Sequence, residues 1–462
     1  MFNHEALREY LKESITFREQ QGYDLSAVKA KIPVNKETDY NVWLALLASI
    51  KDAPLKPDFP YQEPDALDQI RSLRPDGPRK MDYILSDMEL RDKIYGGVLG
   101  RICGIVLGRP TEGWKLNGIE EHLRGANAYP LDNYFPLKTL KNGKIQKYRN
   151  CARLRCIREY VKYAEPDDDI NYILLALKLI EKLGVNFTTL DIGYLWLDNL
   201  GVNWTWGPEH TAYINLARYT EMGERYPQLD PDTLWRVTHY LNEYSEYIGA
   251  LIRGDVFGYV AAGLPEMAAE FAHRDATLTH VKNGIYGEMF ASAMIAAAFC
   301  TNDIKQVVEI GLSEIPANCR LSEAIRNTIK WYEASHDWKE VFRQIDEHYN
   351  FYTMGGTINN AAIIVNGLLA GEGDVEKTLC ITVMQGEDTD CTAATAGSVV
   401  GILTGETLFP VKWSGPLNDT VMSTISGESR NSISGLAQRI FNVGRMICKS
   451  QRKIKYLCDE PV

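Results

Sequence analysis

The sequence of 462 residues lacks a hydrophobic run long enough to cross a bilayer. Its longest uncharged apolar run, residues 289–300, has about half of the roughly 20 residues that a transmembrane helix needs. The N-terminus scatters charged residues where a secretory signal would have its apolar stretch. We therefore expect a cytoplasmic protein that folds in water and has no membrane partner.

An excess of positive charge is also missing. The chain has 50 Lys and Arg residues against 61 Asp and Glu residues, a net charge of −11, so its surface should repel phosphate backbones. We expect no nucleic-acid partner. The nine cysteines are odd in number and include no Cys-x-x-Cys pair, which indicates reduced thiols and neither a disulfide framework nor a zinc site.

Three common catalytic loops have no counterpart in the sequence. These are the Gly-x-x-x-x-Gly-Lys-Ser/Thr phosphate loop, a strand-linked Gly-x-Gly-x-x-Gly, and the Gly-x-Ser-x-Gly nucleophile turn. Their absence weakens nucleoside-triphosphate, dinucleotide and serine-hydrolase interpretations. Any chemistry must therefore depend on carboxylates.

The hydrophobic pattern predicts helices almost throughout. Ile170, Ile173, Leu174 and Leu177 recur at steps of three and four, whereas strand alternation is scarce. The small-residue runs 289–299 and 393–403 are typical of buried helices, because small side chains let neighbouring backbones approach. We predict an all-α fold, a compact multi-helix bundle.

Prolines between residues 54 and 78 interrupt any long helix and mark a change in character along the chain. We place a domain boundary there. The predicted domains are a small helical N-terminal extension, residues 1–80, and an all-α domain, residues 81–462.

Four glycines, Gly96, Gly100, Gly104 and Gly108, fall four residues apart and would form a stripe on one face of a helix through residues 95–107. Each interior glycine costs about 0.5–1 kcal/mol relative to alanine. The pattern therefore indicates that another helix or a ligand lies against this face. Tight helix packing alone would explain it.

Three adjacent carboxylates, Asp167, Asp168 and Asp169, crowd the predicted start of an amphipathic helix. Capping of free N–H groups and attraction to the helix dipole would account for one or two of them. A hard divalent cation such as Mg²⁺ would stabilise all three at once, because it prefers oxygen ligands. The sequence leaves both interpretations open.

A second acidic helix start contains Asp388 and Asp390 and leads into a run of small residues. Asp-x-Asp also arises in ordinary caps and turns, so alone it is weak evidence for a metal. If the two acidic starts meet, they could form a binuclear cation site. Glu112 follows the glycine-striped helix and is a candidate carboxylate in a cleft, although a solvated loop position is the simpler interpretation.

The order of these motifs resembles the ADP-ribosylglycohydrolase family. The shared features are a glycine-rich helix ending in Gly-x-Pro-x-Glu at 108–112, an Asp-Asp helix start near 168, and a late Gly-x-Asp-Thr-Asp at 386–390. The likeness spans roughly residues 90–410 and leaves out the first 80. It implies an all-α bundle and a hydrolase that removes ADP-ribose from a protein side chain or small acceptor.

The resemblance also implies cofactors and roles. The cofactor would be two Mg²⁺ ions, with Mn²⁺ as a substitute, which would hold the ribose hydroxyls while the anomeric carbon develops positive charge. The implied metal ligands are Asp167, Asp168, Asp169, Asp388, Asp390 and Cys391. The implied catalytic residues are Glu112, Asp168 and Asp390, and the implied substrate-binding residues are Asp255, His280 and Asn359.

Three positions depart from the family pattern: Asp167 and Cys391 stand where the family has threonine, and Ile105 stands where it often has aspartate. A soft sulfur is a poor Mg²⁺ ligand, so the metal site could differ. His280, taken alone, is more often a hydrogen-bonded core histidine than a functional one. Two alternatives remain, a hydrolase of another ribosyl glycoside such as a nucleoside-like metabolite and a non-catalytic module that binds ADP-ribose.

Overall fold

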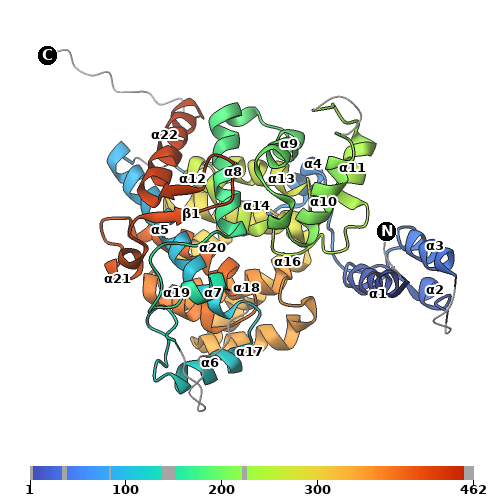
Figure 1. Cartoon of the computed structure of the whole chain (residues 1–462), viewed down its shortest axis with the longest axis horizontal. Coiled ribbons are helices and arrows are strands. Elements are labelled where there is room, and N and C mark those ends of the chain that lie inside the picture. Colours follow the sequence, from blue (N-terminus) through green and yellow to red (C-terminus); the bar gives the residue numbers. More distant parts are fainter. Residues whose placement is uncertain (1–3, 34–38, 83–84, 138–150, 221–225, 452–462) are drawn as a thin grey trace.

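The computed structural model describes residues 4–33, 39–82, 85–137, 151–220 and 226–451 (Figure 1). Over these residues the fold is all-α, as predicted. The first helices are α1 (His4–Gln20), α2 (Ser26–Lys29), α3 (Tyr40–Ile50), α4 (Leu67–Leu73), α5 (Asp87–Gly108), α6 (Leu116–Gly125), α7 (Cys151–Arg155) and α8 (Asp168–Leu183). The middle of the chain forms α9 (Thr189–Asn199), α10 (Gly207–Ala217), α11 (Pro231–His239), α12 (Asp255–Val260), α13 (Pro265–Ala276), α14 (Asn283–Ala298), α15 (Ile304–Leu312) and α16 (Arg320–Ser335).

The remaining helices and a small hairpin complete the fold. The helices are α17 (Trp338–Tyr349), α18 (Thr357–Gly371), α19 (Val375–Met384), α20 (Thr389–Thr404), α21 (Val411–Ser414) and α22 (Ile433–Gln451). The hairpin pairs β1 (Thr420–Met422) with β2 (Arg430–Ser432) in antiparallel register. Short 3-10 turns are η1 (Arg109–Thr111), η2 (Gly184–Asn186), η3 (Val202–Trp204), η4 (Leu251–Arg253), η5 (Asn350–Tyr352) and η6 (Gly415–Leu417).

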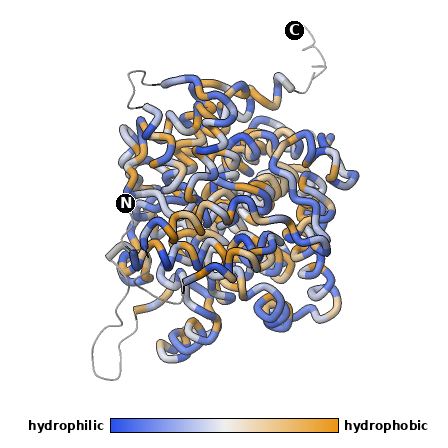
Figure 2. Tube along the Cα trace, turned by 90° about the vertical axis from the view of Figure 1, so that its right-hand side faces the viewer, coloured by the Kyte–Doolittle hydropathy of each residue, from blue (hydrophilic) through white to orange (hydrophobic). Residues whose placement is uncertain are grey.

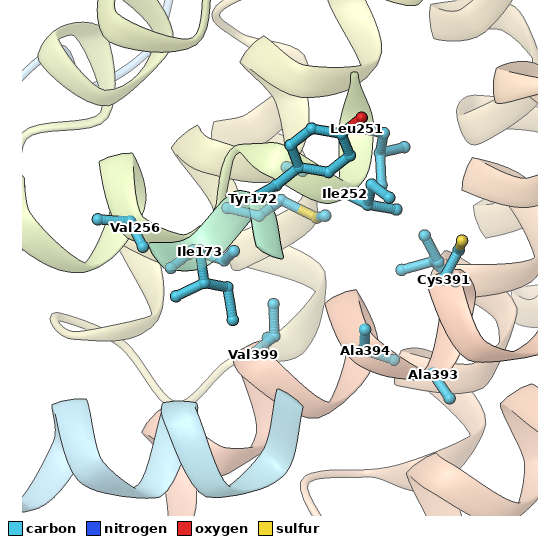
Figure 3. Packing of buried hydrophobic residues seen from close by; sticks show 14 of the residues in the cluster. Tyr172, Ile173, Leu251, Ile252, Val256, Cys391, Ala393, Ala394 and Val399 are labelled. Carbon is cyan, nitrogen blue, oxygen red and sulfur yellow. The ribbon is translucent and has the colours of Figure 1, made fainter. Parts of the chain in front are cut away.

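Helices α14 and α20 are the buried helices that the small-residue runs predict. Every residue of α14 is buried, and so is α20 from Thr389 to Ile402. Hydrophobic and hydrophilic positions alternate along many other helices, as expected of helices that bury one face (Figure 2). Apolar side chains of α8, η4, α12 and α20 meet in the centre of the molecule (Figure 3).

The glycine stripe packs directly against α20. The two helices run antiparallel, and a methyl group on each glycine would collide with a backbone carbonyl oxygen of α20. The pairs are Gly96 with Gly401, Gly100 with Gly397, Gly104 with Ala393, and Gly108 with Thr389. Helix packing therefore accounts for the whole stripe, and no ligand is needed to explain it.

The N-terminal helices α1, α2 and α3 have a small core of their own and lie to one side of the bundle (Figure 1). Phe17 of α1 packs edge-on against Tyr244 and Tyr247 of the main body. Helix α4 differs, because its Ile70 joins the main core. The division of the chain at residue 80 into separately folding units stays a prediction.

Two further expectations concern membrane-spanning helices and the state of the cysteines. Among the described residues, no helix combines the length and the apolar character that a bilayer span requires. Five buried cysteines are free thiols: Cys103, Cys156, Cys319, Cys380 and Cys391.

Substitution of Gly100 tests the packing of α5 against α20. Gly100→Ala should lower the free energy of unfolding by about 1–3 kcal/mol or more, because the new methyl group meets the rigid backbone of α20. The control is Gly118→Ala in α6, where the nearest atom lies 4.0 Å from the added carbon. There the better helix propensity of alanine should raise stability by about 0.5–1 kcal/mol. Urea unfolding followed by circular dichroism measures both, and equal effects would contradict the packing account.

Candidate active site at an acidic cluster

The packing of α5 against α20 brings the end of one helix beside the start of the other. Thr389 Oγ1 donates a hydrogen bond of 2.7 Å to the carbonyl oxygen of Gly108. Asp388 and Asp390 therefore lie next to the turn η1, which leads from Gly108 to Glu112. Residues 281 positions apart in the sequence thus lie side by side.

A short backbone bridge fixes the same region. The N–H of Gly113 donates to the carbonyl oxygen of Glu387 at 2.8 Å, and the N–H of Glu387 donates to that of Trp114 at 2.9 Å. Gly386 has a φ of +83°, and an added Cβ would lie 2.5 Å from the carbonyl oxygen of Trp114. Only glycine suits this position, so the loops that carry Glu112 and Asp388 are held as one unit.

Helix α8 supplies the other acidic group. Asp167 is its N-cap and accepts a hydrogen bond of 3.0 Å from the backbone N–H of Asp169, so capping accounts for Asp167. The thiol of Cys391 donates to Asp169 Oδ2 at 3.4 Å. Two acidic helix starts separated by 222 positions therefore meet through this contact.

Potential ligand atoms gather in both groups. One group is Asp167, Asp168 and Asp169, the other is Asp388, Asp390 and Cys391, and in each the three atoms lie within 4.8 Å of one another. The predicted convergence of these two segments is present in the structure. Glu112 belongs to the same neighbourhood, because its charge raises the pKa of both Asp168 and Asp388.

Three arginines accompany the carboxylates. Arg101 of α5 is completely buried and pairs with Asp169 at 3.0 Å and with Asp255 at 2.8 Å. Arg109 forms an ion pair with Asp167. The third is Arg153 of α7, which pairs with the carboxylate of Glu112 and donates to its carbonyl oxygen at 3.0 Å.

One of these arginines could have been identified from the sequence. Arg101 interrupts the apolar run of a helix whose neighbours are glycine and isoleucine, and a charge in such a place indicates a buried ion pair. Arg109 and Arg153 lie outside regular periodicity and carry no comparable signal.

Burial dominates the electrostatics of the cluster. It raises the pKa of Asp168 to about 6, although the positive charge of Arg109 opposes the shift. It also raises the pKa of Asp169, Asp388 and Asp390 above the usual range for aspartate. Removing so many carboxylates from water is costly unless a positive charge accompanies them.

The donor set fits a hard cation. Asp390 Oδ1 is buried and accepts no hydrogen bond from any described group, so this oxygen would be available to a cation. Asp168, Asp388 and Asp390 form no ion pair with a described lysine or arginine. Carboxylate oxygens are the ligands that Mg²⁺ and Mn²⁺ take. Burial raises the pKa of the Cys391 thiol well above its usual value, and a soft sulfur is a poor ligand for Mg²⁺, so the role of Cys391 as a metal ligand stays a prediction.

The three residues expected to bind substrate are all buried in the interior of the protein. Asp255 is fully buried, where its carboxylate accepts a hydrogen bond from Ser398 and pairs with Arg101. His280 is buried with its Nδ1 2.7 Å from Thr279 Oγ1. Asn359 donates to the carbonyl oxygen of Thr353 at 2.8 Å. Contact of these residues with a ribose stays a prediction.

The neighbouring Asn360 has a direct link to the cluster that sequence reasoning missed. Its Oδ1 accepts a hydrogen bond of 3.3 Å from the backbone N–H of Asp388, and its Nδ2 donates to the carbonyl oxygens of Met354 and Gly356. Asn360 therefore ties the start of α18 to the start of α20. Two adjacent asparagines in the sequence gave no reason to prefer one over the other.

Arg101 can be tested through stability. Arg101→Met should lower the free energy of unfolding by about 3–5 kcal/mol, because Asp169 and Asp255 would keep buried charges without a partner. Arg91→Met is the control on the same helix, where the arginine is exposed and bonds Gln438. This control should stay within about 0.5 kcal/mol of the parent in urea unfolding. A small loss at Arg101 would mean that the two aspartates do not depend on it.

Comparison with known proteins agrees with the motifs. A solved structure titled "ADP-ribosylglycohydrolase-related protein complex" aligns with a TM-score of 0.45 and 16% sequence identity, covering 78% of this chain and 99% of that chain. No protein of curated function matches the chain. The sequence profile of the family described as ADP-ribosylglycohydrolase matches residues 86–449. The chain belongs to the ADP-ribosylglycohydrolase family.

Proposed function

We propose that this protein is a metal-dependent hydrolase that cleaves a ribosyl bond and releases ADP-ribose from a protein side chain or a small acceptor. The observation that carries the proposal is the meeting of two acidic helix starts beside Glu112, at the point where α5 and α20 are locked together. Family membership supports the linkage class, since the family name refers to ADP-ribose glycosides.

The cluster would hold a divalent cation through the three carboxylates that pair with no described lysine or arginine, Asp168, Asp388 and Asp390. Mg²⁺ is the first choice and Mn²⁺ the second, because both prefer carboxylate oxygens. When bound, the cation supplies positive charge that fixes the hydroxyl oxygens of a ribose. Asp167 and Asp169 would support this site, since arginines occupy their carboxylates.

The protein's own carboxylates would perform the bond cleavage. Cleavage of a glycosidic bond passes through a cation-like sugar, which nearby negative charge stabilises. Glu112, oriented by Arg153, would accept a proton from the attacking water. Asp168 and Asp390 would orient that water on the sugar. Asp255 at the start of α12, His280 between α13 and α14, and Asn359 on α18 would support the ribose.

The substrate class can be assigned by comparing turnover on two types of compound. Purified protein with Mg²⁺ should release free ADP-ribose from an ADP-ribosylated peptide over many turnovers, measured by chromatography. Preferred hydrolysis of a simple nucleoside would indicate the alternative ribosyl glycoside. Capture of one ADP-ribosylated peptide per chain without release would indicate a binding module and would contradict the proposed activity.

Glu112→Gln tests the catalytic role of this carboxylate. Loss of a proton acceptor should reduce kcat by about 10²–10⁴-fold. Binding of ADP-ribose, measured by calorimetry, should change much less, because the carboxylate acts on the water rather than on the ligand. The matched control is Glu121→Gln on the exposed face of α6, which should keep full activity. Equal losses of binding and turnover would remove Glu112 from the catalytic step.

Asp388→Asn tests the cation ligands. In the parent protein, ADP-ribose with Mg²⁺ should raise the midpoint of thermal unfolding more than ADP-ribose alone, because binding to the native state stabilises it. The Mg²⁺-dependent part should vanish in Asp388→Asn and persist in Asp232→Asn, an exposed aspartate of α11. A Mg²⁺-dependent shift of unchanged size in Asp388→Asn would contradict its role as a ligand.

A further inference from the structure

Arg109 lies inside the acidic cluster rather than at its edge. Only 12% of its side chain is exposed, and its guanidinium pairs with Asp167, whose side chain is 2% exposed. The same positive charge acts on Asp168 and on Asp390, where it opposes the effect of burial. One fixed cation therefore serves carboxylates from both acidic helix starts.

The arginines divide the carboxylates into two sets. The carboxylate of Asp167 pairs with Arg109 and accepts the N-cap hydrogen bond. The carboxylate of Asp169 pairs with Arg101 and accepts a hydrogen bond from the Cys391 thiol. The second set has no ion pair with a described arginine or lysine and consists of Asp168, Asp388 and Asp390. Three aspartates, one with a buried oxygen that accepts no described hydrogen bond, are enough to hold one divalent ion.

A second divalent ion would meet two obstacles. Ions in two-metal sites lie about 3.5–4 Å apart, so the second would share the ligands of the first and come close to the guanidinium. Repulsion between like charges is strong in such a buried setting. The carboxylates that would hold the second ion already carry arginine partners.

We propose that Arg109 takes the place of one metal ion, so that this chain binds a single divalent cation through Asp168, Asp388 and Asp390. The proposal rests on the proposed metal-dependent function and replaces the two ions implied by the family resemblance. Asp167 then has a clear purpose, because its carboxylate anchors the arginine that stands in for a metal. A chelator cannot remove a guanidinium, so the positive charge of Arg109 is permanent.

Counting bound Mn²⁺ tests the proposal without any measurement of activity. The full-length protein is titrated with Mn²⁺, and free Mn²⁺ is measured by its electron paramagnetic resonance signal. One bound ion per chain is the expected result. Two ions per chain would overturn the role of Arg109 and leave the proposed hydrolase intact. No bound ion would overturn both, so the two failures are distinguishable.

The variant Arg109→Gln removes the charge and frees Asp167. It should bind two Mn²⁺ ions per chain, and the pair should show spin coupling absent from the parent protein. Arg158→Gln is the control, since Arg158 reaches only Asp132, at 3.9 Å, among the ion pairs of the described residues. It should still bind one ion. A count of one in folded Arg109→Gln would overturn the proposal, and the parent count decides the matter where the variant does not fold.

Discussion

The contact between the backbones of α5 and α20 is the constraint on which the rest of the structure depends. Four glycines on α5 let the two helices touch along their length, because any side chain on that face would meet a carbonyl oxygen. The start of α20 is thereby fixed beside the end of α5. Asp388, Asp390 and Glu112 owe their proximity to this packing. The cost of glycine in a helix is thus offset by the position it gives to the site.

Ion pairs between arginines and aspartates are the second factor that holds the site together. The same helix that packs through glycine carries Arg101, and the turn after it carries Arg109. Each arginine pairs with one aspartate at the start of α8. The arginines therefore attach α8 to the α5–α20 pair and also reduce the repulsion among the carboxylates. Asp168, Asp388 and Asp390 form no ion pair with an arginine or lysine of the described residues, and they mark where a cation would bind.

The helices, the close packing of the glycine stripe and the meeting of two acidic segments could be predicted from the sequence. Each of them follows from residue spacing along one helix or from the order of motifs. The ion-pair partners of the carboxylates could not be predicted. Periodicity tells which face of a helix is buried but not which distant side chain lies against it, so the pairing of Arg153 with Glu112 had no signal. The link from Asn360 to Asp388 and the small β1–β2 hairpin likewise depend on tertiary contacts.

The central claim is that two helix starts far apart in the sequence form one cation site. Anomalous diffraction from a crystal soaked in Mn²⁺ tests it most directly. The account predicts an anomalous peak bounded by the carboxylates of Asp168, Asp388 and Asp390, next to the guanidinium of Arg109. A peak elsewhere, or none at this position in fully soaked crystals, would contradict it.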